Sequence, residues 1–180
     1  MTRNSREPPA AGDTDAVPSA RTTLTSTCLC LVTRVTRDGE RQVLLGHKKT
    51  GLGRGKIVGL GGHVEPGEAS ADAAAREAKE EAGIRVSDLA RAAHITFLFP
   101  VRPEWSMTVD VFTTTEFDGD PAETNEIRPE WFGRAALPLD RMWDDARQWL
   151  PRVLDGERLR ATFSYAADCQ TVATSSVVPA

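Results

Sequence analysis

The sequence of 180 residues is poor in the residues that mark several common classes of protein. It has three cysteines and three histidines. Cys28 and Cys30 form the one closely spaced pair, and no second pair or histidine stands at zinc-ligand spacing. We therefore expect buried, reduced thiols and a cytoplasmic location. No apolar run reaches the ~18 residues that a membrane helix needs, and the N-terminal segment lacks the apolar stretch of a secretory signal.

Neither basic nor acidic residues are in large excess. The chain has 22 basic and 26 acidic residues, for a formal net charge of -4. This balance argues against binding to a nucleic-acid polymer or to an anionic membrane. A protein of this charge that binds phosphate must attract it locally, through a metal ion and a few basic side chains. We expect a monomer.

Composition divides the chain into a single domain with a tail at each end. Residues 1–22 are rich in proline, alanine, serine and threonine, and we expect them to be disordered. Residues 23–170 are long enough for one domain with a sizeable core. Residues 171–180 are expected to form a partial strand and then a frayed tail.

Hydrophobic patterning within this domain predicts a mixed sheet between two helices, an α/β sandwich. A basic, glycine-rich loop is predicted at 47–56, where it could meet anionic phosphates. The second helix is predicted over 137–153 and ended or kinked by Pro151. Its candidate anchors are Met142, Trp143, Trp149 and Leu150. The predicted strands are 23–36, 42–46, 84–86, 93–99, 107–115, 126–132 and 159–165.

The stretch 62–84, GHVEPGEASADAAAREAKEEAGI, is the most informative part of the chain. Pro66 and Gly67 indicate a turn. Ser70 is a plausible N-cap for a helix over 71–82, because the residues that follow it are good helix formers. Gly83 is predicted to end the helix as a C′ glycine.

This helix has two different faces. Its alanines recur at helical spacing and predict close packing against a sheet. Away from them, Glu77, Glu80 and Glu81 stand at i, i+3 and i+4, so their carboxylates can converge. One interpretation is a solvated helix face with Arg76 paired to Glu80. The other is a site for a divalent cation such as Mg²⁺ or Mn²⁺, since carboxylate oxygens suit hard ions.

The spacing favours the second interpretation. Gly62, Glu68, Arg76-Glu77, Glu80-Glu81 and Gly83 fall in one register, which resembles the Nudix box, G-x5-E-x7-R-E-U-x-E-E-x-G-U with U apolar. The segments LLGHKKTGLGRGK, GLGGHVEPGE, EIRPEWF and MWDDARQWLP further resemble the oxidised-purine nucleoside triphosphatase branch of that family. The resemblance implies a Nudix-type α/β/α sandwich and Mg²⁺-dependent hydrolysis of a nucleoside triphosphate, such as 8-oxo-dGTP, to monophosphate and pyrophosphate. It thus implies a role in nucleotide-pool sanitation.

The resemblance also implies a role for individual residues. Glu80 or Glu81 would be the general base, with Glu77 beside them and Arg76 steadying a glutamate. The implied metal ligands are Gly61 (through its carbonyl), Glu77, Glu80, Glu81 and Glu126. The implied substrate contacts are Lys48, Phe97, Met107, Trp143 and Asp145. We add their candidate neighbours Gly62, His63 and Asp144 to the predicted substrate site.

Three positions depart from the branch. Val58 replaces an asparagine at the base, Leu52 replaces a pocket phenylalanine, and Ala146 replaces the second of two aspartates. Loss of these groups would relax or redirect the choice of base. Two alternatives therefore stay open: a Nudix pyrophosphatase for another nucleoside diphosphate derivative, and a nucleotide sensor without catalysis.

Overall fold

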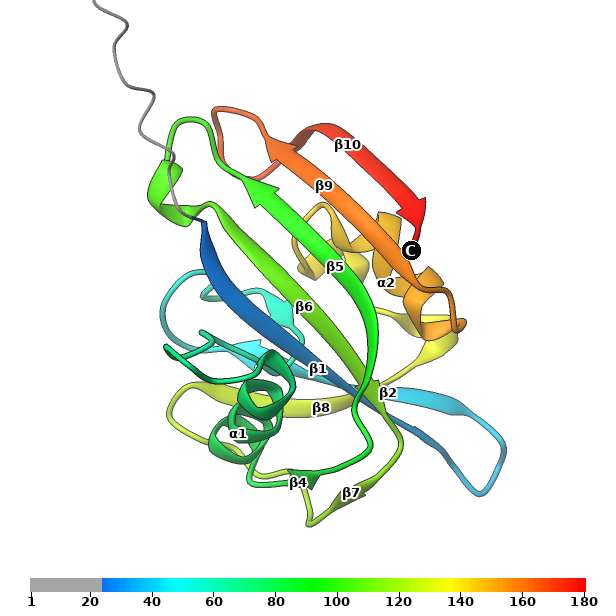
Figure 1. The fold of residues 1–180 in the computed structure, drawn as a ribbon. Helices are drawn as coiled ribbons and strands as arrows, with labels where there is room; N and C mark the ends of the chain where they lie inside the picture. The colour runs from blue at the N-terminus through cyan, green and yellow to red at the C-terminus, as the bar shows by residue number, and fades with distance from the viewer. Residues whose placement is uncertain (1–23) are drawn as a thin grey trace, which may run out of the picture.

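The structure is a computed structural model, and it describes residues 24–180. The predicted tail at 1–22 lies outside the described residues. The rest forms one mixed sheet covered by helices on both faces, with a separate small two-stranded sheet (Figure 1). The α/β class and the sandwich predicted from the sequence are thus confirmed.

The main sheet has eight strands in the order β10-β9-β5-β6-β1-β2-β3, and β8 also pairs with β2. Both parallel pairs, β1 with β6 and β5 with β9, are flanked by antiparallel neighbours. The small sheet pairs β4 with β7. The strand bounds are β1 Thr25–Val35, β2 Arg41–Lys48, β3 Ile57–Val58, β4 Arg85–Val86, β5 Ala90–Leu98, β6 Met107–Thr114, β7 Phe117–Asp118, β8 Ile127–Gly133, β9 Leu159–Tyr165 and β10 Val172–Pro179.

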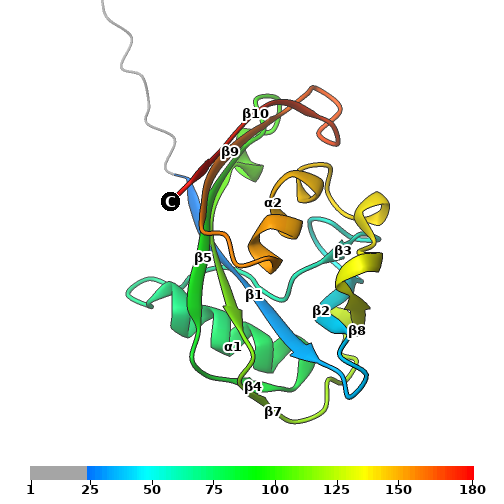
Figure 2. The ribbon, with the colours of Figure 1, turned by 90° about the vertical axis from the view of Figure 1, so that its right-hand side faces the viewer.

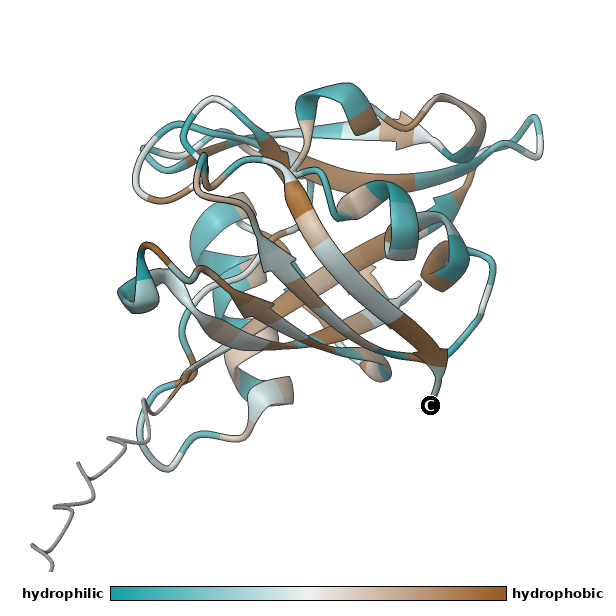
Figure 3. Ribbon diagram, turned by 90° about the horizontal axis from the view of Figure 1, so that it is seen from above, coloured by the Kyte–Doolittle hydropathy of each residue, from teal (hydrophilic) through white to brown (hydrophobic). Residues whose placement is uncertain are grey.

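Two helices cover opposite faces of the main sheet. The helix α1, Ser70–Ala82, packs on one face, and α2, Ala146–Leu154, lies within the curve of the other (Figure 2). Each face has its own buried cluster of hydrophobic side chains. Hydrophobic residues follow the central strands, while many loops are hydrophilic (Figure 3). Among residues 24–180, no helix has the length and hydropathy to cross a membrane.

Strands β1 and β2 separate along part of their length. β1 pairs with β6 over its first eight residues but with β2 only from Thr33 to Val35. The segment 60–63 lies against the first part of β1 instead. There the backbone N–H groups of Cys30 and Cys28 donate to the carbonyls of Leu60 and Gly62 at 2.7 and 2.9 Å. This separation places the glycine-rich segment beside the acidic helix.

The helix α1 begins one residue earlier than predicted. Ala69 is its N-cap residue, so the prediction that Ser70 caps the helix is wrong. The Ser70 hydroxyl instead donates to Asp110 on β6 at 2.8 Å, which ties the first turn to the sheet. Gly83 ends the helix in the left-handed conformation, as predicted. The buried alanines are Ala73, Ala74, Ala78 and Ala82.

The second helix is shorter than the predicted 137–153. Two 3₁₀ turns, η2 Arg134–Ala136 and η3 Leu139–Arg141, and an extended Met142 precede α2. Pro138 lies between the two turns, where its ring cannot continue a helix from η2. Pro151 does not end α2, which continues to Leu154.

The C-terminal segment differs most from expectation. A partial strand and a tail were predicted over 171–180, but β10 pairs with β9 from Val172 to Pro179. Its short side chains gave a weak hydrophobic pattern, because β10 lies at the sheet edge and most of its residues are exposed.

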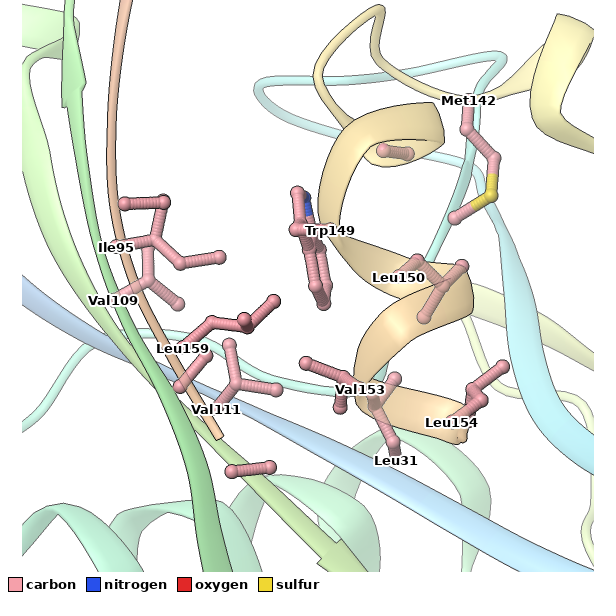
Figure 4. Close-up of a cluster of buried hydrophobic side chains, with 14 of the residues drawn as sticks. Leu31, Ile95, Val109, Val111, Met142, Trp149, Leu150, Val153, Leu154 and Leu159 are labelled. Atoms are coloured by element: carbon pink, nitrogen blue, oxygen red, sulfur yellow. The ribbon is translucent and has the colours of Figure 1, made fainter. Parts of the chain in front are cut away.

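Leu150 is fully buried in the cluster of hydrophobic side chains between α2 and the sheet, which also contains Val153 and Leu31 (Figure 4). We expect Leu150→Ala to lower the free energy of unfolding by about 2–5 kcal/mol, because it leaves a cavity in a packed core. Urea denaturation measures the change. Arg147→Ala, on the exposed side of the same helix, is the control and should cost less than about 1 kcal/mol. Equal losses in the two variants would contradict the packing described for α2.

Candidate active site

The three carboxylates of the acidic helix line one cavity. Glu77, Glu80 and Glu81 all line it, and Glu77 and Glu81 also lie against the segment 60–63. Their environments differ, because the Glu81 side chain is 3% exposed and that of Glu80 is 59% exposed. The structure therefore rejects a fully solvated helix face and brings the predicted cluster together at a cleft.

Glu81 is held from two sides. The backbone N–H of Gly61 donates to one carboxylate oxygen at 2.8 Å, and the Lys48 ammonium donates to the other at 3.1 Å. Burial raises the pKa of Glu81, while the contacts from Gly61 and Lys48 act in the opposite direction. A buried carboxylate fixed in this way is oriented before any ligand arrives.

Arg76 connects the helix to the turn that precedes it. Its guanidinium donates two hydrogen bonds to Glu68, both at 3.0 Å, and reaches Glu77 at 2.9 Å and Glu80 at 3.2 Å. It also donates to the backbone carbonyl of His63 at 3.0 Å. The bidentate bond holds the pKa of Glu68 below its usual range. Arg76 thus fixes the turn and two of the cavity carboxylates relative to each other.

A side chain at Gly61 or Gly62 would collide with neighbouring atoms. A Cβ on Gly61 would lie 2.0 Å from the carbonyl oxygen of Cys28, and one on Gly62 would lie 2.5 Å from a Glu77 oxygen. Glycine lets this backbone run between β1 and the acidic helix. The glycine pair therefore lies directly against β1 and the acidic helix.

The cavity has a volume of about 670 Å³ and two ends of different chemistry. One end carries the carboxylates together with Lys48 and Arg76, and Glu126 also lines it. The other end is aromatic and apolar, formed by side chains of β5, β6, β9 and α2 and of the segments just after β5 and just before α2. Its members include Phe97, Phe99, Met107, Trp143, Trp149 and Tyr165.

Trp143 forms a wall of the aromatic end. Its ring meets the edges of Phe99 and Tyr165, with centroids 6.1 and 5.7 Å away, and the Lys56 ammonium lies 4.7 Å from the ring centre. Phe97 stacks on Phe163, and Phe99 stacks on Tyr165. The sequence predicted Phe97, Met107 and Trp143 as pocket residues, and all three line the cavity.

The two successive aspartates have different surroundings. Asp145 lines the cavity and is 3% exposed. Asp144 does not line it; its carboxylate accepts a bond from the backbone N–H of Val172 at 2.9 Å and pairs with Arg147 at 3.2 Å. The structure thus brings Asp145, but not Asp144, to the predicted base pocket.

The remaining predicted residues, His63 and Gly62, line the cavity next to the carboxylates. Lys49, the neighbour of Lys48, instead pairs with Glu123 at 2.8 Å and with the carbonyl of Thr124 at 2.6 Å. Of these two lysines, Lys48, the last residue of β2, is therefore the one that reaches the acidic end.

The model of the NUDIX domain matches residues 30–153 of this sequence. The chain belongs to the Nudix hydrolase family. Two curated relatives carry the name oxidized purine nucleoside triphosphate hydrolase. The Danio rerio protein is 40% identical over 124 residues, covering 69% of this chain and 79% of its own length. The Mus musculus protein is 38% identical over 125 residues, covering 69% and 80%.

Solved Nudix structures share the fold. A mutator MutT protein from Bacillus halodurans superposes with a TM-score of 0.70 at 26% identity, covering 86% of this chain and 97% of its own. A MutT NUDIX hydrolase from Burkholderia pseudomallei superposes with a TM-score of 0.60 at 22% identity, covering 74% and 97%. This second likeness concerns the fold alone.

The Nudix helix offers donors that suit a hard divalent cation. Carboxylate oxygens and a backbone carbonyl are the ligands that Mg²⁺ takes in proteins. Within residues 24–180, no three acidic, histidine or cysteine side chains already stand in a metal-binding arrangement. Glu77 and Glu81 instead form ion pairs with Arg76 and Lys48. Burial raises the pKa of Glu81, and repulsion by the charge of Glu77 raises it further. A cation between the two carboxylates would relieve that repulsion, so these residues fit a divalent cation.

Two residues of this Nudix cavity were not singled out from the sequence. Phe99 was assigned only to a strand, and Tyr165 only to the closing strand. Tyr165 is the single tyrosine of the chain, and it lies 20 residues from Asp145, to which its hydroxyl donates. Its being the only tyrosine was a visible signal, but no local pattern linked it to the cavity.

Proposed function

We propose that this Nudix hydrolase converts purine nucleoside triphosphates, oxidised ones such as 8-oxo-dGTP included, to the monophosphate and pyrophosphate with Mg²⁺. Mn²⁺ is the expected substitute. The observation that carries the proposal is the two-ended cavity, in which an acidic end continues into an aromatic end. A nucleoside triphosphate has the same division, with a polyphosphate on one side and a flat apolar ring on the other.

The relatives support the choice of substrate. Both the Danio rerio and the Mus musculus proteins are named for hydrolysis of oxidised purine nucleoside triphosphates, and each is covered over most of its length. Trp143 and Phe97 supply aromatic surface for a purine, as that activity requires.

The mechanism assigns the acidic end to the phosphates. Glu77, Glu80, Glu81, Glu126 and the Gly61 carbonyl would hold Mg²⁺. When bound, Mg²⁺ offsets the charge of the triphosphate and makes a water molecule easier to deprotonate. Glu80 or Glu81 accepts the proton of the attacking water. The anhydride bond between the α- and β-phosphates breaks, and pyrophosphate departs.

The basic residues prepare this end for the reaction. Lys48 lies 3.1 Å from Glu81, where its ammonium can also meet a phosphate oxygen. Arg76 keeps Glu77 and Glu80 in place through charge-assisted hydrogen bonds.

A panel of substrates with pyrophosphate readout tests the proposal. The values of kcat/KM for 8-oxo-dGTP, 2-oxo-dATP, dGTP and ADP-ribose are compared at one Mg²⁺ concentration. The proposal expects purine triphosphates to be cleaved and ADP-ribose to be poor. A preference for ADP-ribose would overturn it, and tight nucleotide binding without any hydrolysis would favour a sensor.

Metal binding has a stability readout of its own. We expect Mg²⁺ to raise Tm by a few degrees, because a ligand that binds only the folded chain stabilises it by mass action. Thermal unfolding is compared in Mg²⁺ and in KCl of equal ionic strength. The double variant Glu77→Gln/Glu81→Gln should lose the increase. An equal increase in the double variant would place the ion elsewhere.

A further inference from the structure

The aromatic end of the cavity contains a buried carboxylate with two hydrogen-bond donors from the protein. The indole N–H of Trp149 donates to Oδ2 of Asp145 at 2.6 Å, and the hydroxyl of Tyr165 donates to Oδ1. All three residues are nearly inaccessible to solvent, and all three line the cavity. These three residues are separate from the acidic end, and the proposed hydrolysis of the phosphates does not involve them.

Each donor constrains the carboxylate. The indole N–H can only donate, so Oδ2 must act as an acceptor. Burial and the charge of Asp145 raise the pKa of Tyr165, so the phenol stays protonated and can donate. Each carboxylate oxygen has a second lone pair, which remains available to a ligand in the cavity.

Tyr165 is itself fixed by packing. Its ring stacks on Phe99 with the centroids 4.4 Å apart, and Trp143 meets its edge. The hydroxyl therefore has little freedom, and it holds the carboxylate at a set orientation relative to the Trp143 wall.

We propose that Tyr165 is a positioning residue for base selection: with Trp149, it fixes Asp145 as a paired acceptor that prefers a guanine-type base to an adenine-type base. This inference rests on the proposed function, which places a purine at the aromatic end. Guanine and 8-oxoguanine present two neighbouring N–H donors, the ring N1–H and the 2-amino group. Adenine presents its amino group beside the N1 lone pair, which a carboxylate repels.

Two other residues of the cavity leave the choice of base to Asp145. Val58 and Ala146 also line the cavity and offer only methyl groups. Discrimination by a polar site is strong because a mismatched base leaves buried polar groups unpaired.

Binding of the nucleoside monophosphates tests the inference without needing turnover. The Kd values of dGMP, 8-oxo-dGMP and dAMP are measured by calorimetry in EDTA. We expect the native chain to bind dGMP and 8-oxo-dGMP about 10- to 100-fold more tightly than dAMP, the range expected for one bidentate pair. Equal affinity for dGMP and dAMP would overturn the inference.

The variant Tyr165→Phe removes one hydroxyl and keeps the ring. It should reduce the preference for dGMP over dAMP by about tenfold, because the carboxylate loses one of its two fixed partners. Burial raises the pKa of Asp145, and the bonds from Tyr165 and Trp149 act in the opposite direction. Loss of the Tyr165 bond therefore raises this pKa further and favours the protonated carboxyl, which can donate to adenine. An unchanged ratio in the folded variant would overturn the proposal.

A control separates selection from structure. Thr114→Val removes another buried hydroxyl, which donates to the carbonyl of Ser87 and does not line the cavity. It should lower Tm and leave the dGMP preference intact. Should Tyr165→Phe not fold, Asp145→Asn serves in its place and should abolish the preference; retention of the preference there would overturn the inference.

The outcomes also distinguish this inference from the proposed function. A native chain that prefers dGMP but hydrolyses no triphosphate would overturn the function and support the base selection. A native chain that hydrolyses purine triphosphates without any preference between dGMP and dAMP would support the function and overturn the base selection.

Discussion

Glu81→Gln is expected to lower kcat for purine triphosphate hydrolysis by about 10²- to 10⁴-fold, the range that a general base or its equivalent contributes. The carboxylate is 3% exposed, is held by Lys48 and the Gly61 N–H, and lies at the acidic end of the cavity. The amide has the same shape, so the fold should persist. It carries no charge to balance Lys48 or to hold a divalent cation.

Steady-state kinetics at saturating Mg²⁺ measures this loss, and circular dichroism checks the fold. Asp72→Asn is the matched control, since Asp72 lies exposed in the first turn of the same helix. Its activity should stay within about twofold of the native chain, as for most surface changes. Near-native kcat in folded Glu81→Gln would show that the roles are assigned wrongly. The companion variant Glu80→Gln tells which of the two glutamates takes the proton. The pH dependence of kcat is compared in the two variants, and the variant that lacks the general base should lose the part of this dependence that reports ionisation of the base.

Arg76→Lys is expected to lower kcat/KM by about 10- to 100-fold, as is usual when a residue that orients metal ligands is lost. The charge is kept, but an ammonium cannot make the bidentate bond to Glu68 and also reach Glu77 and His63. The turn 62–68 would then loosen from the helix.

The control is the same substitution at an arginine that does not line the cavity. Arg85→Lys alters an ion pair with Asp118 in which both side chains are 73% exposed. Exposed pairs contribute little, so both activity and stability should be retained. If Arg76→Lys had native kcat/KM, the charge alone would suffice and the bidentate geometry would be irrelevant.

The acidic end of the site could be predicted from the sequence because its residues are close in the chain. Within 62–81, a turn and one helix suffice to bring Arg76 to Glu68 and to place the glutamates on one side. Helical spacing fixes such relations locally. Lys48 and Glu126 were placed by resemblance to the family, and both line the cavity.

The aromatic end depended on contacts between distant strands, which local patterns do not reveal. Tyr165 meets Phe99 because β9 pairs in parallel with β5, a pairing that no local periodicity of either strand specifies. Its bond to Asp145 also requires α2 to begin at Ala146, several residues later than the predicted helix. Asp144 and Asp145 are neighbours in sequence, yet only the fold decides which one lines the cavity.

The product analysis of one reaction tests the central claim most directly. The chain is incubated with 8-oxo-dGTP in Mg²⁺ or in EDTA, and the products are separated by ion-exchange chromatography. We predict 8-oxo-dGMP and pyrophosphate in equal amounts with Mg²⁺ and intact triphosphate in EDTA. Release of single phosphate, or equal turnover in EDTA, would contradict an acidic helix that acts on a polyphosphate through a divalent cation.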